Sequence, residues 1–124
     1  MMITKFPIEE SSATREFGMA CQRLIPWRGD TPEPPVGAMA CFLPAGSASD
    51  PDCHAQDEVM IVLSGGGTIE LDGEKAEFTA NEVLVLPRGK EHVVHASRNV
   101  PCTWVSVYWP LHEHQASGTA EVDA

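Results

Sequence analysis

The segment from Asp52 to Glu58 carries the side chains best suited to chemistry, in the order Asp-Cys-His-Ala-Gln-Asp-Glu. In an extended β-strand, alternate side chains project from the same face. The side chains that would then share one face are Asp52, His54, Gln56 and Glu58. Cys53 would point to the opposite face, so we leave it out of the candidate site.

These groups are suited to one divalent metal ion. Imidazole nitrogens and carboxylate oxygens are the protein ligands that zinc, iron(II) and manganese accept. A further ligand is expected downstream, where the turn residues 87–91 follow the apolar run Val83–Leu86. Such a turn delivers His92 to the start of the next strand. The spacing therefore predicts that His92 completes the metal site from a neighbouring strand.

The two carboxylates are also candidate catalytic residues. Asp52 could bind the metal directly, bind it through water, or orient His54 as a hydrogen-bond acceptor. If Asp52 and Glu58 both bind, the ligand set contains two histidines and two carboxylates. If one of them stays off the metal, the other ligands leave open positions and the free carboxylate could act as a general base.

The rest of the chain reads as short strands separated by turns. Apolar or alternating runs occupy residues 17–25, 36–43, 59–63, 68–71, 75–78, 81–86 and 102–109, and Asp72-Gly73 is a hairpin turn. Long amphipathic helices are absent from the pattern. This organisation predicts an all-β sandwich or barrel. We expect the run 81–86 to be buried.

Three further residues are candidates for binding a substrate. Gln56 shares the ligand face, and Trp27 lies in a proline-rich loop (residues 26–35) that could cover a barrel mouth or simply anchor itself to the core. Tyr108 shares one face of the last strand with Trp104 and Ser106. The other face holds Thr103, Val105, Val107 and Trp109. It is more apolar, so we expect it to be core, which leaves Tyr108 for the pocket or an interface.

Length and charge restrict the function classes. The 124 residues fit a single domain, with an arm over residues 1–14, a barrel over 15–110 and a flexible tail over 111–124. The formal net charge of −10 disfavours nucleic acid and anionic membrane surfaces as partners. No apolar run is long enough for a membrane helix, and the N-terminus has no export core, which favours the cytoplasm.

At the metal-site residues the sequence resembles the cupin family. His54-x3-Glu58-x6-Gly65 matches the second half of the first cupin motif, and Pro87-x-Gly89-x2-His92 matches the middle of the second. The chain departs from the family pattern at three positions. Asp52 stands where the family has its first histidine, Asn81 replaces a glycine and Ala96 replaces the final asparagine. The resemblance implies a double-stranded β-helix, the jelly-roll-like cupin barrel.

The resemblance also implies a range of functions. Residues 26–30 and 107–110 are similar to those of small cupins from bacterial biosynthetic pathways, some of which act with a partner enzyme to form nitrogen-nitrogen bonds. Oxygenase or isomerase chemistry on a small polar metabolite is the broader expectation. Cupins of this size commonly form homodimers through an apolar sheet face. The alternative is a non-catalytic cupin that binds or senses a small molecule.

Overall fold

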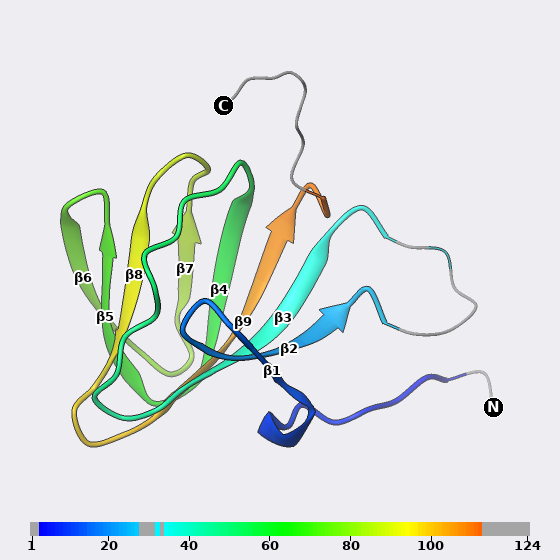
Figure 1. Cartoon of the computed structure of the whole chain (residues 1–124), viewed down its shortest axis with the longest axis horizontal. Coiled ribbons are helices and arrows are strands. Elements are labelled where there is room, and N and C mark those ends of the chain that lie inside the picture. Colours follow the sequence, from blue (N-terminus) through cyan, green and yellow to red (C-terminus); the bar gives the residue numbers. More distant parts are fainter. Residues whose placement is uncertain (1–2, 28–31, 33, 113–124) are drawn as a thin grey trace.

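The structure, a computed structural model, describes residues 3–27, 32 and 34–112. Nine strands make up nearly all of the regular structure in this part of the chain (Figure 1). The one helical element in these described residues is a three-residue turn of 3-10 helix. The described residues contain no helix able to cross a membrane. In chain order the elements are η1 (Glu10–Ser12), β1 (Thr14–Glu16), β2 (Met19–Ile25), β3 (Gly37–Leu43), β4 (Asp57–Ser64), β5 (Gly66–Leu71), β6 (Glu74–Thr79), β7 (Val83–Leu86), β8 (His92–Ala96) and β9 (Cys102–Trp109).

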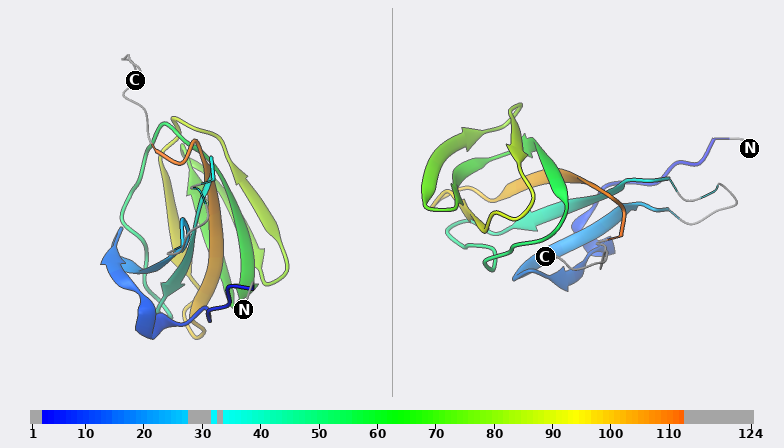
Figure 2. Two further views of the ribbon diagram at one scale, coloured as in Figure 1. Left: turned by 90° about the vertical axis from the view of Figure 1, so that its right-hand side faces the viewer. Right: turned by 90° about the horizontal axis from the view of Figure 1, so that it is seen from above.

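The strands form two antiparallel sheets. One has six strands in the order β1-β2-β3-β9-β4-β7, and the other has three in the order β6-β5-β8. Figure 2 shows the second sheet curling over the part of the first that β4, β7 and β9 form. Strands distant in sequence are paired, as β3 and β9 are through residues 37–43 and 102–108. The all-β prediction is confirmed.

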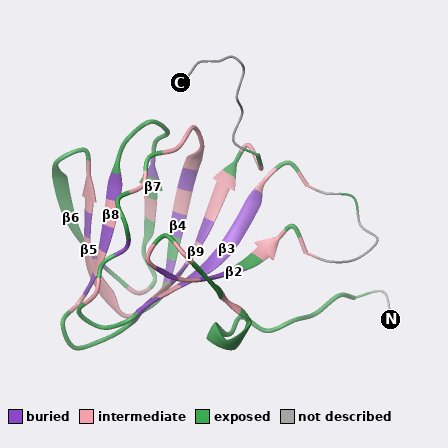
Figure 3. Cartoon of the chain, viewed as in Figure 1, coloured by how far each residue is buried: buried purple, intermediate pink, exposed green. Residues whose placement is uncertain are grey.

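Alternation along the strands fills the space between the sheets. Met60 and Val62 on β4 and Trp104 on β9 are almost fully buried there, together with Leu43, Ile69, Phe78 and Val94 from other strands. The buried segments of the central strands are purple in Figure 3. Burial of these side chains supplies the main free energy that holds the sheets together.

The structure corrects two expectations about burial. The face of β9 that carries Trp104 and Ser106 points inward, whereas Val105 and Val107 lie on the outer face and are only half-buried. On β7, Val83 and Val85 are 60% and 67% exposed, so Leu84 and Leu86 are the covered residues of the run 81–86. Both faces of these strands are apolar, and the sequence pattern alone does not tell which of them meets the core.

The ends of the chain differ in part from the expected boundaries. Thr14–Glu16 forms an edge strand on β2 of the same chain, so the barrel begins slightly earlier than residue 15. Residues 3–9 are exposed, although Gln22 holds them through hydrogen bonds to Glu9 and Pro7. At the other end Leu111 is hydrogen-bonded to Pro35 and so belongs to the folded part. The predicted tail over residues 113–124 lies outside the described residues.

The burial of the cysteines gives a test of this fold. Cys53 is exposed, while Cys21, Cys41 and Cys102 are buried, and burial raises the pKa of the Cys102 thiol to about 11. Because thiolates are the reactive form, a disulfide reagent such as Ellman's reagent should modify one thiol per native chain rapidly. All four should react in guanidinium chloride. Rapid reaction of two or more thiols in the native chain, or of none, would contradict the described core.

Candidate metal centre

The ligand segment is held by backbone hydrogen bonds to β8. Ser49 N–H donates to the Val94 carbonyl at 2.9 Å, and Asp52 and His92 exchange two backbone hydrogen bonds of 3.1 and 2.9 Å. Residues 49–52 thus run beside β8 as an irregular strand. The expected strand over 52–58 is only partly formed, because β4 begins at Asp57. Asp50 N–H donates to the Phe17 carbonyl at 2.8 Å instead of to β8, so regular pairing is interrupted between Ser49 and Asp52.

The second motif fixes His54 as well as supplying His92. Gly89 has a φ of 77°, the left-handed conformation that glycine adopts without steric cost. Its N–H donates to the His54 carbonyl at 2.9 Å. The turn that precedes β8 is therefore hydrogen-bonded to His54, the residue that His92 faces across the site. This contact explains in physical terms why the two motifs come together.

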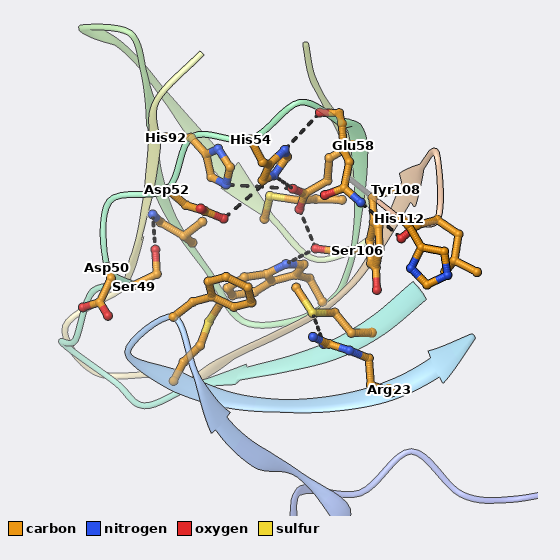
Figure 4. A pocket seen from close by; sticks show the side chains of 18 of the residues that line it. Arg23, Ser49, Asp50, Asp52, His54, Glu58, His92, Ser106, Tyr108 and His112 are labelled. Atoms are coloured by element: carbon orange, nitrogen blue, oxygen red, sulfur yellow. Dashed lines mark hydrogen bonds and ion pairs between the residues drawn. The ribbon is translucent and has the colours of Figure 1, made fainter. Parts of the chain in front are cut away.

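Three of the predicted metal ligands converge. One donor atom each from Asp52, His54 and His92 lies within 4.8 Å of the other two, as the labelled side chains in Figure 4 show. His54 Nε2 is 3.8 Å from Asp52 Oδ2, and the two imidazole rings meet edge to face with centroids 5.5 Å apart. Ligands at about 2.1 Å from one ion lie at most about 4.2 Å apart, so small side-chain movements suffice for a shared metal.

Glu58 lies beside these three residues. Its Oε1 is 3.1 Å from His54 Nε2 and 3.9 Å from His92 Nε2. Its Oε2 accepts a 2.6 Å hydrogen bond from the Ser106 hydroxyl, which itself accepts a 3.0 Å hydrogen bond from Trp104 Nε1. Burial raises the pKa of Glu58, but the hydrogen bonds from His54 and Ser106 outweigh burial and leave that pKa below its ordinary value. Glu58 is thus a buried carboxylate.

The two ring nitrogens of His54 have different surroundings. Nδ1 lies 3.0 Å from the Gln56 carbonyl oxygen, which can only accept, so Nδ1 carries a proton. Nε2 then faces the carboxylates of Asp52 and Glu58. The hydrogen bond to Glu58 is the main reason why the pKa of His54 lies above its ordinary value. A backbone carbonyl on one ring nitrogen, with the other nitrogen directed toward the remaining candidate ligands, is the arrangement found in metal-binding histidines.

These residues line a cavity of about 360 Å³ that lies between the sheets. This volume is at the lower end of the range for small-molecule sites. Its wall is mixed, with thioethers and rings beside the polar groups. The further lining residues include Phe17, Met19, Met39, Met60, Trp104, Tyr108 and Leu111. The cavity can hold a small molecule next to the candidate ligands.

Two of the three predicted substrate-binding residues lie in this cavity. Tyr108 packs over Gly37, where a β-carbon would collide with the phenol ring. Gln56 also lines the cavity, although its Nε2 donates to the carbonyls of Pro110 and Leu111 at 2.9 and 3.3 Å. Much of its hydrogen-bonding capacity therefore holds the chain that follows β9.

Trp27 is placed elsewhere. It lines a separate groove with Phe6 and Pro7 of the N-terminal segment, and it is not among the residues that line the main cavity. The pairing of β2 with β3 shifts register between Arg23 and Ile25, and this irregularity ends the alternation on which a sequence-based placement depends. The adjoining residues 28–31 lie outside the described part of the chain.

Sequence reasoning missed several groups in the cavity wall. Arg23 and Asp50 both line it, and so does His112, which we expected in the tail. His114, the other histidine of the predicted tail, lies outside the described residues. Alternation from Cys21 could have indicated that Arg23 faces inward, but Asp50 and His112 lie in loops with no such pattern. His95, by contrast, points away from the site and pairs with Glu70 at 2.7 Å, as expected for a surface residue.

Comparison with known proteins identifies the family. The model of the family described as "Cupin domain" matches residues 39–108, which is more than half of the chain. The chain therefore belongs to the cupin family, and its fold is the cupin barrel. This result confirms the resemblance that the residues His54, Glu58 and His92 indicated.

Solved structures agree with this fold. A Cupin 2 conserved barrel domain protein from Salinispora arenicola CNS-205 is 25% identical, with a TM-score of 0.78 over 88% of this chain and 90% of that chain. The plu4264 protein from Photorhabdus luminescens is 24% identical, with a TM-score of 0.74 over 88% of each chain. KdgF from Halomonas sp. is 20% identical, with a TM-score of 0.64 over 78% of this chain and 83% of that chain.

Among curated proteins, a short segment is similar to the endoribonuclease YbeY of Myxococcus xanthus. The two are 41% identical over 54 residues, which is 44% of this chain. The segment spans only 18% of the length of that protein. The match thus concerns a small part of the curated protein, and we assign no nuclease activity on it.

The hydrogen bonds around Glu58 predict the effect of Ser106→Ala. The change removes the hydroxyl that donates to the buried Glu58 carboxylate and accepts from Trp104. We expect the chain without metal to lose about 1–3 kcal/mol of unfolding free energy, because the buried Trp104 N–H loses its acceptor and the buried Glu58 carboxylate loses one of its two donors. Urea denaturation in EDTA measures this loss. Ser97→Ala, at an exposed hydroxyl, is the control and should cost less than about 0.5 kcal/mol. Equal stability of the two variants would contradict the description.

Proposed function

We propose that this cupin is a metal-dependent enzyme that acts on a small polar metabolite. The observation that carries the proposal is the convergence of donor atoms from Asp52, His54 and His92 at the wall of a cavity. Backbone hydrogen bonds to β8 and to Gly89 hold the segment that carries Asp52 and His54. A set of imidazoles and carboxylates held in this way is suited to zinc, iron(II) or manganese.

In this proposal His54, His92 and Asp52 hold one divalent ion, and Glu58 is a fourth ligand or a neighbour that neutralises it. Such an ion would polarise a substrate oxygen or nitrogen atom or present dioxygen. The side chain of Asp52 is 27% exposed, whereas that of Glu58 is 7% exposed. Asp52 is therefore the more accessible of the two candidate bases, and Glu58 the more firmly held. Gln56 and Tyr108 would contact the substrate from the remaining wall.

The reaction class is open within this proposal. Isomerase or oxygenase chemistry and a nitrogen-nitrogen bond-forming rearrangement in a bacterial biosynthetic pathway, with or without a partner enzyme, all use a cupin metal and a small substrate. A cytoplasmic location also stays a prediction. The second candidate is a binding or sensing cupin without catalysis, which the aspartate at the family's first histidine position favours. A binding module predicts ligand affinity that survives chelation, whereas the enzyme predicts turnover that chelation abolishes.

Metal content tests the site directly. The purified, untagged chain should bind about one zinc, iron(II) or manganese ion, and His92→Ala should weaken that binding by at least about tenfold, because a ligand is lost. Elemental analysis and calorimetric titration measure stoichiometry and affinity.

The matched control is His95→Ala, which removes a histidine from the same strand on its other face. It should bind metal like the parent. The proposal fails if no ion binds to the parent chain, or if His92→Ala and His95→Ala bind metal equally well.

We also propose that two copies pair through the outer face of β4, β7 and β9. Val59 lies between Val85 and Val107, and Ile61 lies between Val83 and Val105, in adjacent strands. These side chains form one uncharged patch on chains that each carry a net charge of −10. A second copy fits it best, since a flat apolar sheet face can stack on itself without bringing like charges together.

Val85→Lys tests this pairing. A lysine on each copy would be desolvated within the interface, so we expect the variant to be monomeric at concentrations where the parent is a dimer. Analytical ultracentrifugation measures both masses. Val100→Lys is the control, because Val100 is 47% exposed in the loop before β9 and off the patch. A monomeric parent, or a dimeric Val85→Lys variant, would overturn the proposed dimer.

A further inference from the structure

The cavity has two chemically different ends. The candidate metal ligands come from β8, β4 and the segment before β4. On the far side, Arg23 projects from β2, and Figure 4 shows its guanidinium below Ser106 and apart from the histidines. Tyr108 and His112 line the same side of the cavity. A bound molecule would thus meet the candidate metal ligands at one end of the cavity and the positive charge of Arg23 at the other.

The guanidinium is only partly used by the protein. Nη2 pairs with Glu16, and Nη1 donates to Met39 Sδ at 2.8 Å. A thioether is a weak acceptor, and a guanidinium has five N–H groups. In the described part of the chain the Arg23 guanidinium donates to these two groups, so some of its five N–H groups remain available to a ligand. Glu16 orients the side chain and at the same time competes for it.

Charge makes Arg23 distinctive among the cavity residues. The wall carries three carboxylates, those of Asp50, Asp52 and Glu58. Among the described lining residues there is one arginine, Arg23, and no lysine. Burial raises the pKa of the nearby Tyr108 phenol, which Arg23 partly opposes, so the phenol stays protonated and able to donate. Away from the histidines that would hold the metal, Arg23 is therefore the fixed positive charge in the described wall that can attract an anion.

We propose that Arg23 binds a carboxylate of the substrate, so that the substrate is a small acid held by its anionic end on β2 and by its reacting end at the metal. This inference rests on the proposed function and narrows its substrate class. Arginine is suited to the role because its planar fork matches a carboxylate with two parallel hydrogen bonds. Arg23 also borders the groove that contains Trp27, but the candidate ligands lie only in the main cavity.

Paired ligands can measure the contribution of Arg23. The probes are the monohydroxamic acids of succinate, glutarate and adipate, each compared with its own methyl ester, titrated into the zinc-loaded chain by calorimetry. The hydroxamate binds zinc in both members of a pair, and only the acid offers a carboxylate. At the best chain length we expect the acid to bind roughly three- to tenfold more tightly, a modest effect because water reaches a side chain that is 42% exposed.

Variants separate recognition from folding. Arg23→Ala should remove the preference for the acid and leave ester affinity unchanged, whereas Arg98→Ala, an equal change of charge in the β8–β9 loop, should keep the preference. Glu16→Gln breaks the same ion pair as Arg23→Ala but frees the guanidinium. It should therefore bind the acid at least as tightly as the parent does. A purely structural Arg23 would make Glu16→Gln and Arg23→Ala behave alike.

Failure of this inference can be told from failure of the metal site. If zinc binds but the acids and esters bind equally, or if Arg23→Ala keeps the preference, the metal proposal stands and the role of Arg23 is wrong. If no zinc binds, the plain dicarboxylates glutarate and adipate are titrated in EDTA. Saturable binding that Arg23→Ala abolishes and Arg98→Ala retains would then support the anion site, and no binding to the parent would overturn it.

Discussion

The buried carboxylate of Glu58 is the constraint to which the rest of the site responds. An ionised group between two sheets is costly unless hydrogen bonds and opposite charge compensate for lost water. Ser106 and His54 supply those partners, and Trp104 holds Ser106 in turn. Trp104 and Ser106 thus both point inward from β9. Trp104 packs in the core, and Ser106 donates to Glu58 in the site. A divalent ion beside the histidines would add to the same compensation.

Much of the candidate site could be predicted from the sequence, because its residues recur at fixed spacings. His54, Glu58 and His92 come together since the turn at Gly89 and the pairing of Asp52 with His92 are local consequences of glycine, proline and strand alternation. Asp52 also joins them, although the stretch that carries it is not a regular strand. The proposed direct role of Asp52 depends on this contact with β8.

Other features could not be predicted, and the reasons are physical. Valine on both faces of β7 and β9 makes periodicity uninformative about which face is inside, and a surface that another copy could cover looks like core in a single sequence. The register shift in β2 removes the alternation needed to place Trp27. Loop residues such as Asp50 reach the cavity through long-range packing. No spacing rule connects them to the histidines.

The hydrogen bonds from Gln56 to Pro110 and Leu111 join two parts of the cavity wall that differ in how firmly they are held. One part belongs to β4 and β8, and the other is the chain that follows β9. On the side of β4 and β8, each position is tied into backbone pairing, so changing the shape of that wall would disturb the sheets. On the side of residues 110 and 111 the chain has left the sheets, and Gln56 and a backbone hydrogen bond to Pro35 are among the contacts that hold it. Substitutions there can reshape the cavity at little cost to the barrel. One wall therefore carries the candidate metal ligands while the other can change its shape, and directed evolution toward new ligands would best start at Leu111.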